Sequence, residues 1–131
     1  VVGVLLDTNA FLWQVQSKTG GRLGPNAKQL ISQSTTVYVS SITLVEIHIK
    51  AMLGKLDAPK NLESLVVESN DSILEFSAAA ADTMRSFTSL VRHDPFDRMI
   101  LAQAKASKLK LLTSDRTLLD LGLPYVIDAT Q

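Results

Sequence analysis

The apolar run Val4-Leu5-Leu6 stops abruptly at a carboxylate, Asp7, which is followed by Thr8 and Asn9. A run of this length suits a strand that is buried on both faces. Residues 10–16 are expected to form a short helix that Asn9 is able to cap. Asp7 is therefore expected at the carboxyl edge of a parallel sheet, the edge where open α/β sheets hold their ligand sites.

Strand patterns and helix patterns alternate along the rest of the chain. The expected strands cover residues 2–6, 35–39, 73–76, 110–113 and 125–127. The expected helices cover residues 10–16, 25–34, 42–53 (capped by Ser41), 61–69, 77–90, 95–107 and 116–121, and residues 17–25 are expected to form a flexible loop. This alternation predicts an α/β fold with a mainly parallel central sheet between helices.

Length and composition narrow the class of protein. A chain of 131 residues that is 46% hydrophobic is expected to form a single domain, residues 1–131, with its own core. The absence of cysteine excludes disulfides, thiolate zinc sites and cysteine nucleophiles, and it fits a reducing cytosol. No apolar run approaches the ~18 residues of a membrane span, and no signal peptide is evident. We therefore expect a cytoplasmic protein with no membrane partner.

The formal net charge is zero, so no basic field covers the whole protein. The charges are nevertheless unevenly distributed. Residues 57–82 contain six acids and one base, whereas residues 85–116 contain seven bases and three acids. One interpretation is a solvated face on each half. The other is a basic rim beside an acidic pocket, as a phosphate-backbone substrate requires.

Four acids are expected to converge on the same edge of the sheet. Asp7 ends the first strand, and Asp115 follows the strand at residues 110–113. Glu46 lies in the second turn of one helix, and Asp97 lies in the first turn of another. Acids gathered in this way repel one another unless a hard cation such as Mg²⁺ or Mn²⁺ binds between them. Zinc fits poorly, because the chain has no cysteine and only two histidines.

Each acid also has a purely structural explanation. Asp7 and Asp115 are able to cap the helices that follow them. Glu46 is able to pair with Lys50 one turn later, and Asp97 with Asp94 in an arrangement like a capping box. The metal-site interpretation therefore depends on the convergence of the four acids and not on any one of them.

Polar and basic residues beside these acids are the candidate substrate ligands. The hydroxyl and amide candidates are Thr8, Asn9, Thr113 and Ser114, all of which are also common in caps and turns. Arg98 and Arg116 are the candidate bases for stabilising negative charge on a phosphoryl group. His93 and Asp94 precede Pro95 and either shape that turn or border the site.

Four segments of the chain have a familiar order and spacing. They are LLDTNAFLW at residues 5–13, SSITLVEI at 40–47, HDPFDRMILAQA at 93–104 and LLTSD at 111–115, of which the third is the most specific. Together they resemble the PIN-domain family and, more narrowly, the VapC-type toxins of bacterial toxin–antitoxin pairs. The segment at residues 20–25 looks looser than the corresponding loop of that family.

The resemblance implies a three-layer α/β/α fold and a metal-dependent endoribonuclease that hydrolyses RNA. By motif position, Asp7, Glu46 and Asp97 match the acidic triad of the family, and Asp115 matches a fourth, less constant acid. Thr113 or Ser114 corresponds to a hydroxyl position near the metal. The resemblance further implies a homodimer and a cognate antitoxin whose C-terminal segment covers the active site.

Hydrolysis by a water bound to Mg²⁺ or Mn²⁺ does not require the RNA 2′-hydroxyl as nucleophile, so 5′-phosphate products are expected. Two other classes remain as alternatives. A phosphoacceptor or phosphatase site also places Asp after a parallel strand, but the dehalogenase-like pattern requires Asp where this chain has Asn9. A PIN-like module that binds RNA or protein without cleavage is the non-enzymatic alternative.

Overall fold

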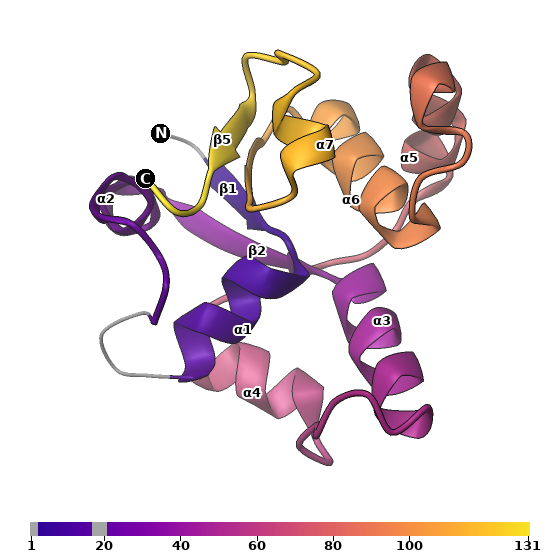
Figure 1. Cartoon of the computed structure of the whole chain (residues 1–131). Helices are drawn as coiled ribbons and strands as arrows, with labels where there is room; N and C mark the ends of the chain where they lie inside the picture. The colour runs from indigo at the N-terminus through magenta and orange to yellow at the C-terminus, as the bar shows by residue number, and fades with distance from the viewer. Residues whose placement is uncertain (1–2, 17–20) are drawn as a thin grey trace.

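A computed structural model describes residues 3–16 and 21–131 of the chain (Figure 1). Five strands form one sheet in the order β3-β2-β1-β4-β5. They are β1 (Gly3–Leu6), β2 (Thr36–Ser40), β3 (Ser72–Leu74), β4 (Lys110–Thr113) and β5 (Val126–Asp128). Every pairing is parallel, which confirms the predicted sheet.

Helices cover both faces of this sheet. They are α1 (Thr8–Gln16), α2 (Pro25–Gln33), α3 (Ser41–Met52), α4 (Leu62–Glu68), α5 (Ala78–Thr83), α6 (Pro95–Ala106) and α7 (Arg116–Leu119). Figure 1 shows α1 and α4 on one side of the sheet and α5, α6 and α7 on the other. The predicted three-layer α/β/α fold is therefore confirmed.

The central strands supply alternate side chains to two separate cores. Val4 and Leu6 of β1 pack with residues of α1, α2 and α4, whereas Leu5 packs with residues of α6. In β4, Leu112 belongs to the first core and Leu111 to the second. All of these side chains are fully buried. An unbroken apolar run is thus the pattern required of a strand between two helical layers.

The structure corrects two details of the predicted helices. The helix expected over residues 77–90 ends at Thr83 and continues as two 3₁₀ turns, η1 (Met84–Ser86) and η2 (Thr88–Leu90). Phe87 leaves the helical conformation between these turns and is buried in the second core. Ser40, and not Ser41, caps α3, because its hydroxyl accepts a hydrogen bond from the Ile42 amide.

The expected start of the first strand at residue 2 and residues 17–20 of the expected flexible loop lie outside the described residues. The described remainder of that loop packs against the C-terminal end of the chain. The Gly24 amide donates to the Ala129 carbonyl at 2.9 Å. A Cβ atom on Gly24 would lie 2.1 Å from the Gln131 carbonyl oxygen, so only glycine allows this close approach. Within the part of the chain that the structure describes, no helix is long and apolar enough to span a membrane.

Candidate active site

A small polar cavity of about 190 Å³ lies at the carboxyl edge of the sheet. Asp7 reaches it from the end of β1, and Asp115 from the end of β4. Glu46 reaches it from α3, and Asp97 from the first turn of α6. The residues that line this acidic pocket are Asp7, Thr8, Asn9, Glu46, Lys50, Asp94, Asp97, Ser114 and Asp115. The structure therefore brings all four predicted acids to one place.

Hydrogen bonds hold both carboxylate oxygens of Asp7, which is only 5% exposed. The Ala10 amide donates to Oδ1 at 2.8 Å, and the Thr113 hydroxyl donates to Oδ2 at 2.6 Å. Asp7 thus caps α1, and the expectation that Asn9 is the cap is wrong, because Asn9 already lies within the helix and is exposed. Burial raises the pKa of Asp7 to about 6 although these hydrogen bonds lower it.

Glu46 is also buried and is held by partners on both of its oxygens. The Thr8 hydroxyl donates to Oε1 at 2.7 Å, and the Thr8 oxygen lies 3.1 Å from the hydroxyl of Thr43. Lys50 donates to Oε2 at 2.6 Å. The hydrogen bond to Glu46 raises the pKa of Lys50, so this side chain is charged at neutral pH. The expected pair between Glu46 and Lys50 is thus present inside the pocket.

Asp97 and Asp115 share the imidazole of His93. The His93 Nε2 atom lies 3.3 Å from Asp97 Oδ2 and 3.2 Å from Asp115 Oδ2. Asp115 also caps α7, because its Oδ1 accepts from the Leu118 amide at 3.1 Å. Asp94 caps α6 by accepting from the Phe96 amide at 2.8 Å. For Asp94 and Asp115, a capping role and a place on the pocket wall therefore coexist.

The two acids around His93 have opposite pKa shifts. Burial, together with the hydrogen bond and charge of the neighbouring Asp115, raises the pKa of Asp97 to about 8. Burial alone would also raise the pKa of Asp115, but hydrogen bonds from Asp97, the Leu118 amide and His93 lower it. A proton shared by this pair therefore lies on Asp97, which then donates to Asp115.

The donor set suits a hard divalent cation. Within the described residues, His93, Asp97 and Asp115 offer ligand atoms that lie within 4.8 Å of one another. The oxygens of Asp7 and Glu46 complete the acidic lining of the same cavity. A divalent cation would replace the shared proton and offset both the burial and the like-charge repulsion that raise the pKa values of Asp7 and Asp97. Carboxylate oxygens are the ligands that Mg²⁺ and Mn²⁺ prefer.

The other predicted site residues divide into two groups. Thr8, Asn9 and Ser114 line the acidic pocket. Thr113 is fully buried and orients two acids, because its hydroxyl donates to Asp7 and accepts from the Asp115 amide at 3.0 Å.

Neither arginine lies on the wall of the acidic pocket. Arg116 is exposed and lies 3.3 Å from Asp120 and 4.0 Å from Asp128. The Arg98 Nε atom is buried with no hydrogen-bond partner among the described residues. Lys50 is a site residue that the sequence analysis did not assign to the pocket. Its spacing of four residues from Glu46 on one helix is the feature that could have indicated this.

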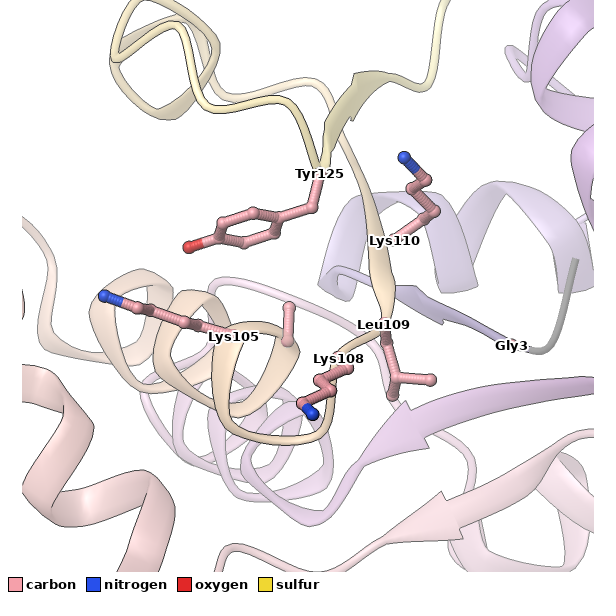
Figure 2. Close-up of a pocket in the computed structure, with 7 residues that line it drawn as sticks. Gly3, Lys105, Lys108, Leu109, Lys110 and Tyr125 are labelled. Atoms are coloured by element: carbon pink, nitrogen blue, oxygen red, sulfur yellow. The ribbon is translucent and has the colours of Figure 1, made fainter.

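A second, larger cavity of about 500 Å³ lies at the amino ends of β1 and β4. Figure 2 shows the residues of this lysine pocket, which are Gly3, Ala104, Lys105, Lys108, Leu109, Lys110 and Tyr125. Its lysines lie at and beyond the last turn of α6, where cations complement the helix dipole. They belong to the basic segment of the sequence but lie at the opposite edge of the sheet from the acids. They therefore do not form the basic rim considered from the sequence.

The fold and the site together define a class: a three-layer α/β protein with a cluster of acids at the carboxyl edge of its sheet. The model of the PIN domain family matches residues 4–122. The chain therefore belongs to the PIN domain family, as its motifs predicted. Among curated proteins, no sequence gives a significant match.

Solved structures of toxin–antitoxin proteins share this fold. The chain is similar to VapBC2 from Rickettsia felis bound to a promoter DNA fragment, with a TM-score of 0.67, 21% identity and 96% of each chain covered. It is similar to DNA-bound VapBC from Salmonella typhimurium, with a TM-score of 0.64, 23% identity and 96% of each chain covered. The chain is also similar to VapC20 from Mycobacterium tuberculosis, a toxin that cleaves the sarcin–ricin loop. The TM-score is 0.59 at 18% identity, and the match covers 94% of this chain and 98% of that chain.

Proposed function

We propose that this protein is a metal-dependent endoribonuclease of the VapC type, which hydrolyses phosphodiester bonds in RNA. The observation that supports this most directly is the acidic pocket, where four acids from separate elements of a PIN domain meet in one cavity. Mg²⁺ or Mn²⁺ is the proposed cofactor, since the donors are carboxylates and one imidazole.

In this proposal the residues of the chain have separate tasks. Asp97 and Asp115 hold the cation with Asp7 and Glu46, while Thr113 and Thr8 fix the last two carboxylates in place. The cation, when bound, makes a coordinated water more acidic and stabilises negative charge on the phosphoryl oxygen. Asn9 and Ser114 offer hydrogen-bonding groups on the pocket wall for the RNA strand.

The proposed partners are a cognate antitoxin and a second copy of the chain. Two of the similar solved structures are VapBC complexes, which supports an antitoxin. The surface of α3 supports a further interface, because Val45, Ile49 and Met52 are 46%, 38% and 83% exposed. Apolar side chains gathered on one helix face are typical of an interaction surface. We place the protein in the cytoplasm, where an RNA-cleaving toxin meets its substrate and its antitoxin.

The test is an RNA cleavage assay on purified protein without antitoxin, in Mg²⁺, in Mn²⁺ and in EDTA. Asp7→Asn and Asp97→Asn are the matched variants, because each removes one carboxylate charge and keeps the side-chain shape. We expect cleavage that requires both the metal and both carboxylates. A protein that binds Mn²⁺ through these acids but cleaves no RNA would favour the non-cleaving module, and one that does neither would eliminate the catalytic proposal.

The chemistry of the product ends tests the mechanism separately. If a bound cation supplied the attacking water, hydrolysis would leave 5′-phosphate and 3′-hydroxyl ends. Mass spectrometry of the cleaved RNA should therefore detect 5′-phosphates. Fragments that end in 2′,3′-cyclic phosphate would instead require the RNA 2′-hydroxyl as nucleophile and would contradict this mechanism.

A further inference from the structure

Lys50 is a cation inside a pocket of acids. Its ammonium nitrogen lies 2.6 Å from Glu46 Oε2, and its side chain is 44% exposed against 6% for that of Glu46. Among the described residues that line the acidic pocket, Lys50 is the one lysine or arginine, while five of the others are acids. A positive charge at this position offsets part of the repulsion between those acids.

The two partners of this ion pair differ in how firmly they are held. Glu46 is fixed from its other side, because its Oε1 accepts from Thr8, which in turn contacts the buried Thr43. Lys50 lies in the last turn of α3, its side chain is 44% exposed, and its ammonium group has no other ion-pair partner among the described residues. When a second cation competes for Glu46, Lys50 is therefore the partner that is free to move.

From this geometry, and building on the proposed function, we infer that Lys50 holds Glu46 in the metal-free site and is displaced by the metal. The displaced ammonium group then contacts a phosphate of the RNA strand. A divalent cation bound to Glu46 repels an ammonium group at 2.6 Å. The anion that arrives with the substrate is the phosphodiester, and the remaining acids of the pocket repel it. A lysine at the mouth of the pocket supplies the attraction that these acids cannot.

This inference predicts effects of opposite sign in one variant. Lys50→Met keeps the aliphatic stem of the side chain and removes the charge. Since the metal no longer competes with the ammonium group, we expect Lys50→Met to bind Mn²⁺ about fivefold more tightly, a factor typical of a partly exposed ion pair. The same variant should bind RNA more weakly and lose about one unit of the slope of log affinity against log salt. A purely structural lysine would weaken both interactions or neither.

Mn²⁺ binding is measured by isothermal titration calorimetry on the full chain. RNA binding is measured by fluorescence anisotropy with a labelled single-stranded RNA of mixed sequence in Ca²⁺, with the RNA checked for integrity after each titration. Lys55→Met is the matched control, because Lys55 is exposed and lies five residues further along the chain. We expect this control to match the wild type in both assays. Lys50→Arg retains the charge and should restore most of the RNA affinity.

The outcomes separate this inference from the proposed function. If the wild type did not bind Mn²⁺, both the inference and the proposed function would be overturned. Normal Mn²⁺ binding in the wild type, with equal or weaker binding in Lys50→Met, would overturn the inference alone. Tighter Mn²⁺ binding with unchanged RNA affinity would contradict the phosphate contact. Ammonium-detected NMR gives a direct check, since the Lys50 signal should change on addition of Mg²⁺.

Discussion

The acidic pocket and the lysine pocket lie at opposite edges of the same sheet and differ in how far their charged groups are exposed to solvent. The lysine pocket has a volume of about 500 Å³, and the acidic pocket has about 190 Å³. The lysines of the larger cavity complement the end of α6, and Lys105 also lies 5.4 Å from the centre of the Phe87 ring. In the smaller cavity, burial and like charges raise the pKa of Asp97 to about 8.

This difference shows that size is a poor guide to chemistry here. The lysines of the larger cavity are exposed, so water screens their charges, whereas Asp7 and Glu46 are buried beside the other acids of the acidic pocket and repel them until a proton or a cation binds. Uncompensated charge held in fixed positions is the feature that indicates a ligand.

The largest effect is expected from removal of one acid in the acidic pocket. Asp97→Asn should lower metal-dependent RNA cleavage at least about a hundredfold, because even the outer partners of metal ligands contribute 10- to 100-fold. Lys108→Met, in the lysine pocket, should keep wild-type activity in the same assay. Equal losses in both variants would mean that the two cavities do not differ as described.

A smaller loss of activity is expected from Thr113→Val. This change removes the donor to Asp7 Oδ2 and the acceptor of the Asp115 amide, while it preserves the shape of the side chain. We expect Mn²⁺ affinity to fall about tenfold, as for other second-layer partners. Calorimetric titration measures this loss, and Thr113→Ser should recover most of it. Full affinity in Thr113→Val would mean that Asp7 needs no orienting partner.

Asp71 is a buried acid that lines neither the acidic pocket nor the lysine pocket but a third cavity of about 550 Å³ beside α4 and β3. It tests whether a raised pKa alone indicates a metal site. Burial raises the pKa of Asp71 to about 6, and its one hydrogen bond, from Gln14 at 3.2 Å, only partly opposes this. Since the native state holds this proton more tightly than the unfolded state, the contribution of Asp71 to stability is complete below about pH 4 and is lost as the pH rises through 6.

Asp71→Asn should therefore raise the free energy of unfolding by about 2 kcal/mol at pH 8 and by much less at pH 4. Urea unfolding at the two pH values measures the difference. Mn²⁺ should not change this increment, because Asp71 lies outside the acidic pocket. If the gain in stability vanished when Mn²⁺ was added, Asp71 would be a metal ligand and not merely a buried acid.

The smallest effect is expected in the lysine pocket. The Tyr125 hydroxyl is buried and has no hydrogen-bond partner among the described residues. Tyr125→Phe removes that unpaired group, so stability should be unchanged or higher by up to about 1 kcal/mol. Thermal unfolding would detect the change, and RNA cleavage should match the wild type. A marked loss of activity would assign this cavity a role that its exposed, solvent-screened charges do not suggest.

Much of the acidic pocket was predictable from the sequence, because strand ends are visible as points where apolar runs stop. The runs before Asp7 and Asp115 both end at the carboxyl edge of a parallel sheet. The neighbour relation between the two strands was not predictable. Pairing of Leu6 with Leu112 brings Thr113 beside Asp7, and periodicity does not encode which strands become neighbours.

Side-chain contacts that depend on the course of a loop could also not be predicted from the sequence. His93 meets Asp115 across 22 positions because the turn before α6 folds back toward β4. Arg98 and Arg116 lie beside site acids in the sequence but not on the pocket wall, because adjacent residues of a helix point in different directions. The catalytic and binding roles of all these residues remain predictions that the experiments above test.

The hydrogen bond between Thr113 and Asp7 spans 106 positions of the chain. During synthesis, β1 leaves the ribosome long before β4, since domains are made from the amino end. Until β4 adds to the edge of β1, Asp7 lacks its orienting hydroxyl, and Asp115 is absent altogether. A nascent chain therefore has no complete acidic pocket. A protein that cuts RNA would in this way remain harmless to the message and the ribosome producing it until β4 is made.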